Sequence, residues 1–162
     1  MIRKVEVSDA SRIAEIYNYY IEHTTITFEE EIVTDREMRQ RIENILAKNY
    51  PYRVYEEKGL LTAYAYLNNW RSRSAYNRTL ETSIYVDIHY TGRGQGSALY
   101  NDLIEKARAA RIHSLIGGIS LPNEISRKLH EKSGFQRIGN FREAGLKFNR
   151  WIDVEFWQLM LE

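Results

Sequence analysis

The alternation of apolar and polar positions divides the first part of the chain into one predicted strand and two predicted helices. Residues 2–7 alternate as a short strand, and Ser8 or Asp9 can cap the helix that follows. The apolar face of that helix recurs at helical spacing, at Ala10, Ile13, Tyr17, Tyr20 and Ile21. Thr34 and Glu37 then have the spacing of a capping box. The helix that they begin carries an apolar side made of Met38, Ile42, Ile45 and Leu46.

Three strands are predicted in the middle of the chain. Residues 52–56 and 60–67 flank Lys58-Gly59, which is a hairpin signal. Residues 78–88 alternate strictly, as a strand with two different faces does. One face carries Leu80, Thr82, Ile84, Val86 and Ile88, and the other carries Glu81, Ser83, Tyr85 and Asp87.

The last part of the chain predicts a helix over residues 97–110, a buried strand over 114–121, and a short helix that Asn123 caps and Gly134 ends. Strands over 136–147 and 152–161 follow. The predicted order is β-α-α-β-β-β-α-β-α-β-β, which is typical of a layered α+β or α/β architecture with a mixed, mostly antiparallel sheet. No linker or repeat interrupts the chain, so residues 1–162 are predicted to form a single domain.

Charge and cysteine content exclude several classes of function. The 162 residues include 23 Lys+Arg and 22 Asp+Glu, a net charge of +1, whereas a nucleic-acid module normally presents a strongly basic face. The chain has no Cys, which excludes a disulfide framework and a thiol nucleophile, and its four His show no metal-ligand spacing. No apolar run approaches the ~20 residues that span a bilayer. A cytoplasmic protein without a membrane segment, a bound metal or nucleic acid is therefore expected.

A glycine-rich turn at residues 92–97, with the sequence Gly-Arg-Gly-Gln-Gly-Ser, separates a predicted strand from a predicted helix. Glycines allow close approach of a ligand to the backbone, and a helix N-terminus attracts phosphate groups. The spacing fits neither a P-loop nor a Rossmann fingerprint. Taken alone, this segment predicts either a pyrophosphate site, to which Arg93 adds a bidentate donor, or only a tight turn.

The strand at 81–86 followed by this turn resembles the acyl-CoA motif of the GNAT acetyltransferase superfamily, usually written Q/RxxGxG/A. Gly94 and Gly96 match its glycines, and Thr91 stands where Gln or Arg is expected. Residues 123–135 are similar to the second half of the superfamily pattern, NxxSxxLHExxGF. Residues 16–18, 25–29, 69–76 and 145–158 resemble segments of the phosphinothricin and methionine sulfone/sulfoximine acetyltransferases. The resemblance covers essentially residues 2–160.

The resemblance implies a GNAT fold, in which the central strands at 78–88 and 114–121 splay apart around the pantetheine arm of acetyl-CoA. It implies a homodimer, and Lys147 and Arg150 are expected to be able to reach a neighbouring subunit's pocket. The residues that it assigns to acetyl-CoA are Ile84, Tyr85, Val86, Gly92, Arg93, Gly94, Gln95, Gly96, Ser97 and Asn123.

Glu81 and His130 are the candidate catalytic residues. The strand pattern alone favours a solvated carboxylate at Glu81, whereas the resemblance implies that Glu81 frees the acceptor amine of a proton, usually through water. A lone helical His such as His130 is more often a packed or surface residue. By resemblance it is a candidate to protonate the departing CoA thiolate, a step that solvent could also perform.

The resemblance places the acceptor beside Phe28, Glu29, Arg73, Ser74, Ala75 and Tyr76. A solvated basic loop is the other interpretation of the arginines, and Arg73 and Tyr76 are favoured over Arg71 for binding an acceptor oxyanion. The expected reaction is acetyl transfer to a small amino-acid-like amine such as phosphinothricin, methionine sulfoximine or methionine sulfone. The alternatives are acetylation of a protein N-terminus, a lysine or another small amine, and a non-catalytic acyl-CoA-binding module.

Overall fold

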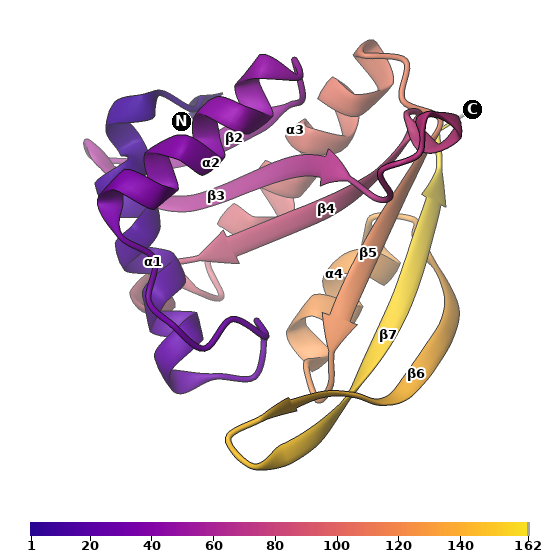
Figure 1. Ribbon diagram of the computed structural model, residues 1–162. Coiled ribbons are helices and arrows are strands. Elements are labelled where there is room, and N and C mark those ends of the chain that lie inside the picture. The colour runs from indigo at the N-terminus through magenta and orange to yellow at the C-terminus, as the bar shows by residue number, and fades with distance from the viewer. Residues whose placement is uncertain (162) are drawn as a thin grey trace.

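A mixed seven-stranded sheet is the centre of the structure, a computed structural model that describes residues 1–161 (Figure 1). Its strands lie in the order β1-β2-β3-β4-β5-β7-β6, and every neighbouring pair is antiparallel except β4 with β5. The strands are β1 (Ile2–Lys4), β2 (Tyr52–Glu57), β3 (Leu60–Asn69), β4 (Thr79–Val86), β5 (Ser114–Ser120), β6 (Gln136–Lys147) and β7 (Arg150–Met160). The predicted α+β class and the mostly antiparallel sheet are confirmed.

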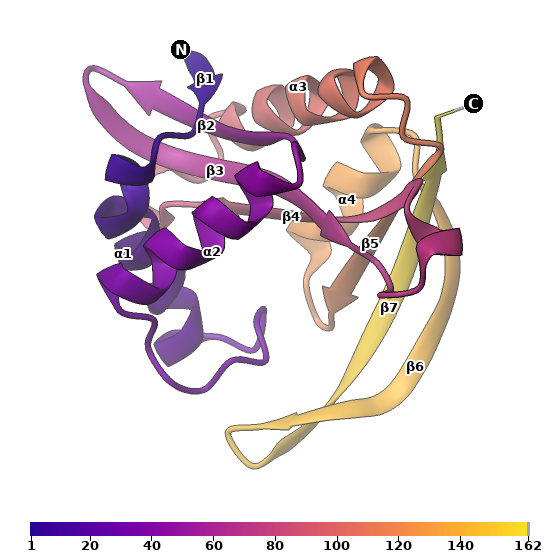
Figure 2. The ribbon, with the colours of Figure 1, turned by 45° about the horizontal axis from the view of Figure 1, so that its top comes forward.

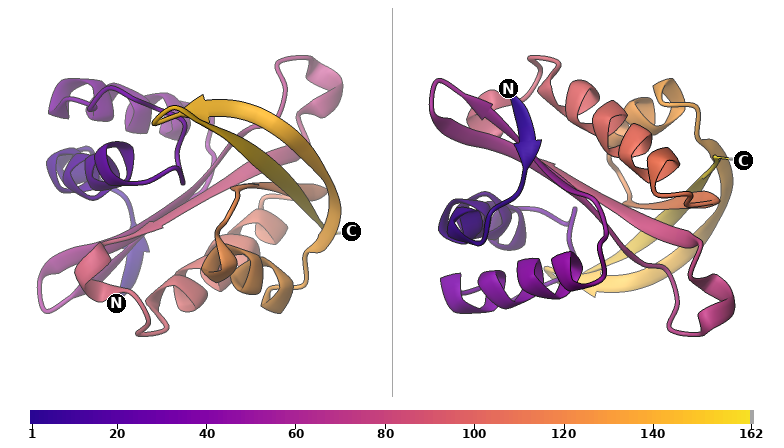
Figure 3. Two further views of the ribbon diagram at one scale, coloured as in Figure 1. Left: turned by 90° about the horizontal axis from the view of Figure 1, so that it is seen from below. Right: turned by 90° about the horizontal axis from the view of Figure 1, so that it is seen from above.

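Two pairs of helices cover the two faces of the sheet, as Figures 2 and 3 show. α1 (Ala10–His23) and α2 (Asp35–Ala47) lie on one face, and α3 (Gln95–Ala109) and α4 (Glu124–Lys132) lie on the other. Each face has its own apolar core, one centred on Ile13, Ile42 and Val54 and the other on Leu80, Leu99 and Leu115. None of the helices within residues 1–161 is long and apolar enough to cross a membrane.

The first helix begins at Ala10 after Asp9, as predicted, but the Asp9 side chain does not cap it. β1 ends at Lys4, and a 3-10 turn over Val7–Asp9 leads into α1. The Asp9 carboxylate does not cap α1, because it accepts from the Glu6 backbone N–H at 2.8 Å and from the Arg3 guanidinium. The second helix is capped as expected, since the Thr34 hydroxyl oxygen accepts from the Glu37 N–H at 3.2 Å.

The central strands β4 and β5 pair over a short stretch only. Thr79–Glu81 lie opposite Ser114–Ile116, and beyond these residues the two strands diverge into the V seen in Figure 1. Each strand keeps a full partner on its outer side, because β3 pairs with β4 as far as Val86 and β7 pairs with β5 as far as Ser120. The splayed pair expected from the family resemblance is therefore present, and it leaves backbone groups of β4 without a strand partner on the side of β5.

Candidate active site

Glu81 lies where the V begins, opposite Asn68 of β3 and Ile116 of β5. Its carboxyl is largely shielded from solvent, and burial raises its pKa above the usual value for Glu, against the opposing charge of Arg71. A Cβ built at Gly118 of β5 would lie 3.6 Å from Glu81 Oε1, which is ordinary van der Waals contact, so β5 passes close to this carboxyl. Gly118 therefore lies beside a carboxylate that is more basic than usual.

The arginines before β4 occupy two different places. Arg71 stacks on the Trp70 ring with its Cζ 4.8 Å from the ring centroid, and Trp70 packs edge-on against Phe156 of β7. Arg73 precedes a 3-10 turn over Ser74–Tyr76, and all four of these residues are exposed, Tyr76 to 40%. Arg71 is thus the arginine whose charge acts on Glu81, while the favoured Arg73 lies on the surface of the β3–β4 connection.

The segment between α1 and α2 closes against the β6–β7 hairpin. A Cβ at Gly145 would lie 2.4 Å from the ring of Phe28, so this close packing requires glycine. Lys147 is 1% exposed, and its Nζ donates to the Thr27 carbonyl oxygen at 2.9 Å. Lys147 is therefore bound within its own chain, and the prediction that it reaches a neighbouring subunit's pocket is wrong, because β6 folds back onto this segment.

Glu29 is not a free carboxylate. Arg41 of α2 holds it with two hydrogen bonds, of 2.9 and 2.6 Å, and the Tyr17 hydroxyl donates to it as well. The hydrogen bonds from Arg41 lower the pKa of Glu29. The negative charge of Glu29 is therefore balanced inside the protein.

His130 lies on the α3/α4 side of the sheet and is 4% exposed. Its Nδ1 is 2.7 Å from the Ser126 carbonyl oxygen and its Nε2 is 3.0 Å from the Tyr100 hydroxyl, which lies 2.8 Å from Thr82 Oγ1. Because a carbonyl can only accept, Nδ1 carries the proton and Nε2 accepts from Tyr100. Burial also lowers the pKa of His130, which favours the neutral ring. Neither ring nitrogen then has a free proton for a thiolate.

The glycine turn leaves open space around two of its glycines. Gly92 and Gly94 have φ of 77° and 80°, and a Cβ built on either would meet no atom within 4 Å. Gly94 is the N-cap of α3, so the helix begins at Gln95 and not at Ser97, and its first N–H groups are directed toward this open space. Gly96 lies against β4, because a Cβ built on it would lie 3.4 Å from the Val86 side chain.

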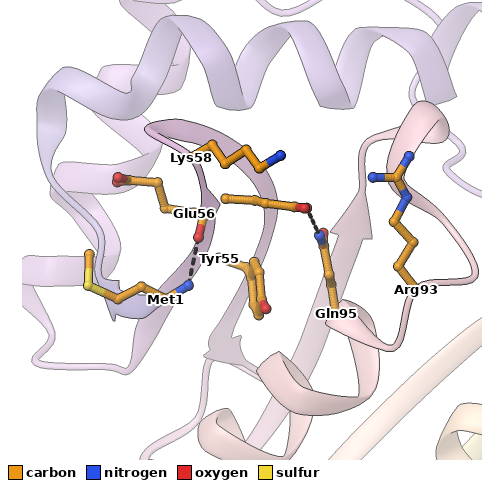
Figure 4. A pocket seen from close by; sticks show the side chains of 7 residues that line it. Met1, Tyr55, Glu56, Lys58, Arg93 and Gln95 are labelled. Atoms are coloured by element: carbon orange, nitrogen blue, oxygen red, sulfur yellow. Dashed lines mark hydrogen bonds between the residues drawn. The ribbon is translucent and has the colours of Figure 1, made fainter.

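Two side chains of the turn have partners of their own. Arg93 stacks on Tyr90 with its Cζ 4.7 Å from the ring centroid and remains exposed. Gln95 is buried, accepts from Thr62 at 2.8 Å and donates to Glu57 at 2.5 Å, so that only its backbone is left for a ligand. A pocket of about 400 Å³ on this β2 side of the turn, drawn in Figure 4, is lined by both acidic and basic side chains, namely Glu56, Glu57, Lys58 and Arg93.

The remaining residues assigned to the cofactor lie along the V. Ile84, Tyr85 and Val86 have strand partners only in β3, and the Val86 carbonyl accepts from the Tyr20 hydroxyl at 2.5 Å. Asn123 caps α4, its Oδ1 accepting from the Ser126 N–H at 3.1 Å. A thioester held in the V would therefore meet the unpaired edge of β4 close to Glu81.

Sequence patterns did not identify several groups of the site. Thr82 and Tyr100 read as ordinary strand and helix positions, and their contact with His130 depends on how α3 and α4 pack on the sheet. The Gly117-Gly118 pair was the one visible signal. A Cβ at Gly117 would lie 2.3 Å from His130 Nε2, and a Cβ at Gly118 would lie 3.3 Å from the Phe156 ring. Two adjacent glycines inside a buried strand indicate such close approaches.

Comparisons with known proteins agree with this geometry. The sequence matches the acetyltransferase (GNAT) domain family over residues 2–156. It is 37% identical over 157 residues to a phosphinothricin N-acetyltransferase of Streptomyces viridochromogenes, with 97% of this chain and 85% of that protein covered. It is 35% identical over 161 residues to an L-methionine sulfoximine/L-methionine sulfone acetyltransferase of Salmonella typhimurium, with 99% and 94% covered.

A solved structure shares the whole fold. A putative acetyltransferase from Salmonella typhimurium, solved with its cofactor acetyl-CoA, superposes with a TM-score of 0.98 at 34% identity and covers 100% of this chain and 94% of its own. The family match includes β4, which carries Glu81, the glycine turn, and α4, which carries His130. The splayed strands, the open glycine turn and the sequence match together show that this chain belongs to the GNAT acetyltransferase family.

Proposed function

We propose that this protein transfers the acetyl group of acetyl-CoA to the amine of a small amino-acid-like acceptor, of the phosphinothricin or methionine sulfoximine/sulfone type. The observation that carries the proposal is the juxtaposition of a shielded Glu81 with the open V between β4 and β5. The relatives at 35–37% identity act on acceptors of this type. With no Cys in the chain, direct attack of the amine in a ternary complex fits better than a thiol acyl-enzyme.

In this proposal the chain binds acetyl-CoA, which supplies the activated acetyl thioester, along the V. The backbone of the turn at residues 92–97 and the start of α3 hold the pyrophosphate, and Arg93 adds a charged donor. Ile84, Tyr85 and Val86 present the unpaired strand edge that orients the thioester, and polarisation of its carbonyl by a backbone N–H assists attack. Asn123 acts through α4, whose N-terminus it caps.

Glu81 is the proposed general base. An aliphatic amine is mostly protonated at neutral pH, and only the neutral form attacks the thioester. A carboxylate whose pKa is raised by burial accepts that proton more readily, directly or through one water. The new C–N bond then forms as the C–S bond breaks, and the second amine proton is lost to solvent.

The thiolate that leaves needs one proton. His130 remains a catalytic candidate from the family resemblance, but its Nδ1 proton is engaged by Ser126 and its Nε2 accepts from Tyr100. We favour solvent as the proton source. In this form of the proposal His130 and Tyr100 are positioning residues. They hold Thr82 of β4 in place, next to the point where β4 and β5 diverge.

The proposed acceptor site lies between Glu81, the α1–α2 segment and the β3–β4 connection. Phe28 packs against the apolar stem of the acceptor. Glu29, which Arg41 holds with two hydrogen bonds, fixes the position of the α1–α2 segment beside it. Arg73, with Ser74, Ala75 and Tyr76, binds an acceptor oxyanion. Arg71 instead lowers the pKa of Glu81.

The proposal includes a homodimer. The long edge strand β6, its neighbour β7 and the turn between them expose a set of apolar side chains, namely Ile138, Phe141, Leu146, Phe148 and Trp151. Exposed edge strands with such side chains commonly pair with another chain. Sedimentation should give a dimer that Phe141→Asp and Trp151→Asp weaken. A cytoplasmic location stays a prediction, which cell fractionation would test.

A thiol-release assay tests the main proposal. Acetyl-CoA is mixed with the protein and with phosphinothricin, methionine sulfoximine, methionine sulfone, a lysine-containing peptide or peptides with free N-termini. We expect turnover with at least one amino-acid analogue, and kcat/KM values for the peptides lower by at least about tenfold. Turnover with the peptides alone would assign the chain to protein acetylation. Binding of acetyl-CoA without turnover of any amine would indicate an acyl-CoA-binding module.

A further inference from the structure

The connection between β4 and α3, which contains the glycine turn, is tied at both ends to one residue of β3, Thr62. The Thr62 carbonyl oxygen accepts from the backbone N–H of Asp87, the residue after the end of β4, at 2.8 Å. The Thr62 hydroxyl donates at 2.8 Å to Oε1 of Gln95, the first residue of α3. Gly92 and Gly94 therefore lie between two contacts with the same residue.

A β-bulge in the β2–β3 pair explains why the Thr62 side chain faces α3. Tyr55 lies opposite Ala63 and Glu56 lies opposite Leu61, so Thr62 has no partner in β2. In a regular strand Leu61 and Ala63 would share one face of the sheet. Here Leu61 packs in the core on the α1/α2 face, and Ala63 packs in the core on the α3/α4 face. The extra residue thus directs the Thr62 side chain toward α3, as bulges near functional sites commonly do.

Gln95 is the buried residue that links Thr62 to the start of α3. It is 5% exposed, and its Nε2 donates to the Glu57 carboxylate at 2.5 Å, the bond drawn at Gln95 in Figure 4. A carboxylate can only accept, so this bond fixes which end of the amide faces Glu57 and leaves Oε1 for the Thr62 hydroxyl. An apolar side chain at position 95 would leave that hydroxyl only the Tyr55 carbonyl oxygen, 3.5 Å away. Glutamine therefore matches both of its partners.

The Asp87 side chain fixes the other end of the connection. Asp87 is buried, and its carboxylate pairs with Arg12 of α1 and accepts from the His89 backbone N–H at 2.9 Å. Arg12 Nε donates in turn to the Leu61 carbonyl oxygen at 3.0 Å, next to Thr62. Both ends of the connection are therefore held at residues 61–62 of β3.

The glycine turn has little other support. Residues 91–94 are exposed, so packing in a core does not order them. Glycine has more backbone freedom than other residues, and ordering a flexible loop costs free energy when a ligand binds. Contacts that hold the ends of the turn in place before the ligand arrives reduce this cost.

We infer that Thr62 and Gln95 are positioning residues for acetyl-CoA, because they hold the turn and the start of α3 in the conformation that receives the pyrophosphate. The inference rests on the proposed function, which places the pyrophosphate at this turn. The two side chains are bonded inside the protein and act on the cofactor through the backbone of the turn. Their contribution is therefore to cofactor affinity and not to the acetyl-transfer step.

Binding of CoA tests this inference without any acceptor. Calorimetry compares the wild type with Thr62→Val, Gln95→Leu and Thr62→Ser, the last of which keeps the hydroxyl. Thr79→Val is the matched control, because it removes a hydroxyl that lies 2.9 Å from Ser114 Oγ at the opposite end of β4. We expect Thr62→Val and Gln95→Leu to raise the Kd for CoA by about three- to tenfold, with Thr62→Ser and Thr79→Val within about twofold of the wild type.

Three results would overturn the inference. The first is an unchanged Kd for CoA in folded Thr62→Val and Gln95→Leu. The second is an equal increase of this Kd in Thr79→Val, which would indicate a general loss of stability. The third is a Thr62→Ser protein that binds CoA as weakly as Thr62→Val does, because the hydroxyl would then not be the group that matters.

A donor without the pyrophosphate separates positioning of the turn from a structural defect elsewhere. S-acetyl-pantetheine keeps the thioester but lacks the pyrophosphate and the nucleotide. We expect Thr62→Val and Gln95→Leu to lower kcat/KM for acetyl-CoA about three- to tenfold through KM, with kcat/KM for S-acetyl-pantetheine unchanged. Equal losses with the two donors would assign the effect to the fold and overturn the inference. If no amine is acetylated, the proposed function fails, and the CoA affinities still decide the role of Thr62 and Gln95.

Discussion

Glu81 combines burial with a nearby cation, and the two have opposite effects on its pKa. At neutral pH we expect Glu81→Gln to lower kcat by ~10²–10⁴-fold, the usual contribution of a general base. The deficit should shrink at alkaline pH, where the free amine deprotonates unaided. Because the folded pKa is raised, wild-type activity should fall as the pH drops through a value above that of ordinary Glu. The pH–rate profiles of both proteins with one acceptor provide the measurement, and equal rates at neutral pH would remove Glu81 from the mechanism.

Arg71 and Arg73 lie close in sequence and should give different phenotypes. Arg71 lowers the pKa of Glu81, so Arg71→Ala should move the acidic limb of the pH–rate profile to higher pH. Arg73→Ala should leave that limb in place and raise the acceptor KM by about 10- to 100-fold, through loss of a charge-assisted hydrogen bond. The KM for acetyl-CoA should change in neither variant. A parallel rise of both KM values in Arg73→Ala would indicate a structural or cofactor role for that residue.

The turn between β4 and α3 depends on two glycines with positive φ whose Cβ directions are open. We expect Gly94→Val to raise the KM for acetyl-CoA by at least about tenfold, because the side chain would occupy the space proposed for the phosphates. Gly59→Val is the matched control, since Gly59 has the same φ of 80° and equally open surroundings in the β2–β3 hairpin. If both variants lose stability equally and retain acetyl-CoA affinity, the phosphate site is elsewhere.

A substitution at His130, where α4 contacts the sheet, tests whether this residue or solvent protonates the thiolate. His130→Gln removes the imidazole but keeps an amide that can pair with Tyr100. If solvent protonates the thiolate, kcat at neutral pH should fall by less than about threefold, and the pH–rate profile should keep its shape. Loss of 10²-fold or more in a variant with wild-type melting temperature and acetyl-CoA affinity would restore His130 as the proton donor.

Across the whole molecule, Glu155 ties β7 to two other elements. It is 2% exposed and accepts from Arg127 of α4, Arg137 of β6 and the Trp157 indole. Burial alone would raise the pKa of Glu155, but these hydrogen bonds and charges hold this pKa below its usual value. A depressed folded-state pKa stabilises the fold above the unfolded-state pKa of Glu, and this contribution is lost as the pH falls through the folded value.

Glu155→Gln should therefore lower the free energy of unfolding at neutral pH, by roughly 1–3 kcal/mol, because buried donors lose a charged acceptor. The difference from the wild type should narrow as the pH drops below the ordinary pKa of Glu. Urea unfolding at neutral and acidic pH measures this. A difference that stays constant with pH would assign the loss to packing, and Glu124→Gln, on the exposed end of the Arg127 pair, is the control.

The sequence by itself determined the order and type of the elements, because apolar periodicity at Ile13–Ile21 and along β4 is local information that packing did not override. The predicted strand over 78–88 is shorter in the structure, since it ends at Val86 and a 3-10 turn begins at Ile88. It also determined the family, through the glycine turn and the α4 motif. The predicted side-chain cap of the first helix was wrong, because the Asp9 carboxylate pairs with Arg3 instead. The start of α3 was placed two residues late, since the helix begins at Gln95. The tertiary structure alone decided the pairing of Glu29 with Arg41, the burial of Lys147 against Thr27, the Tyr100–His130 contact and the hydrogen bond from Thr62 to Gln95. Each joins residues from different elements, and no spacing along a chain encodes which side chains two packed elements bring together.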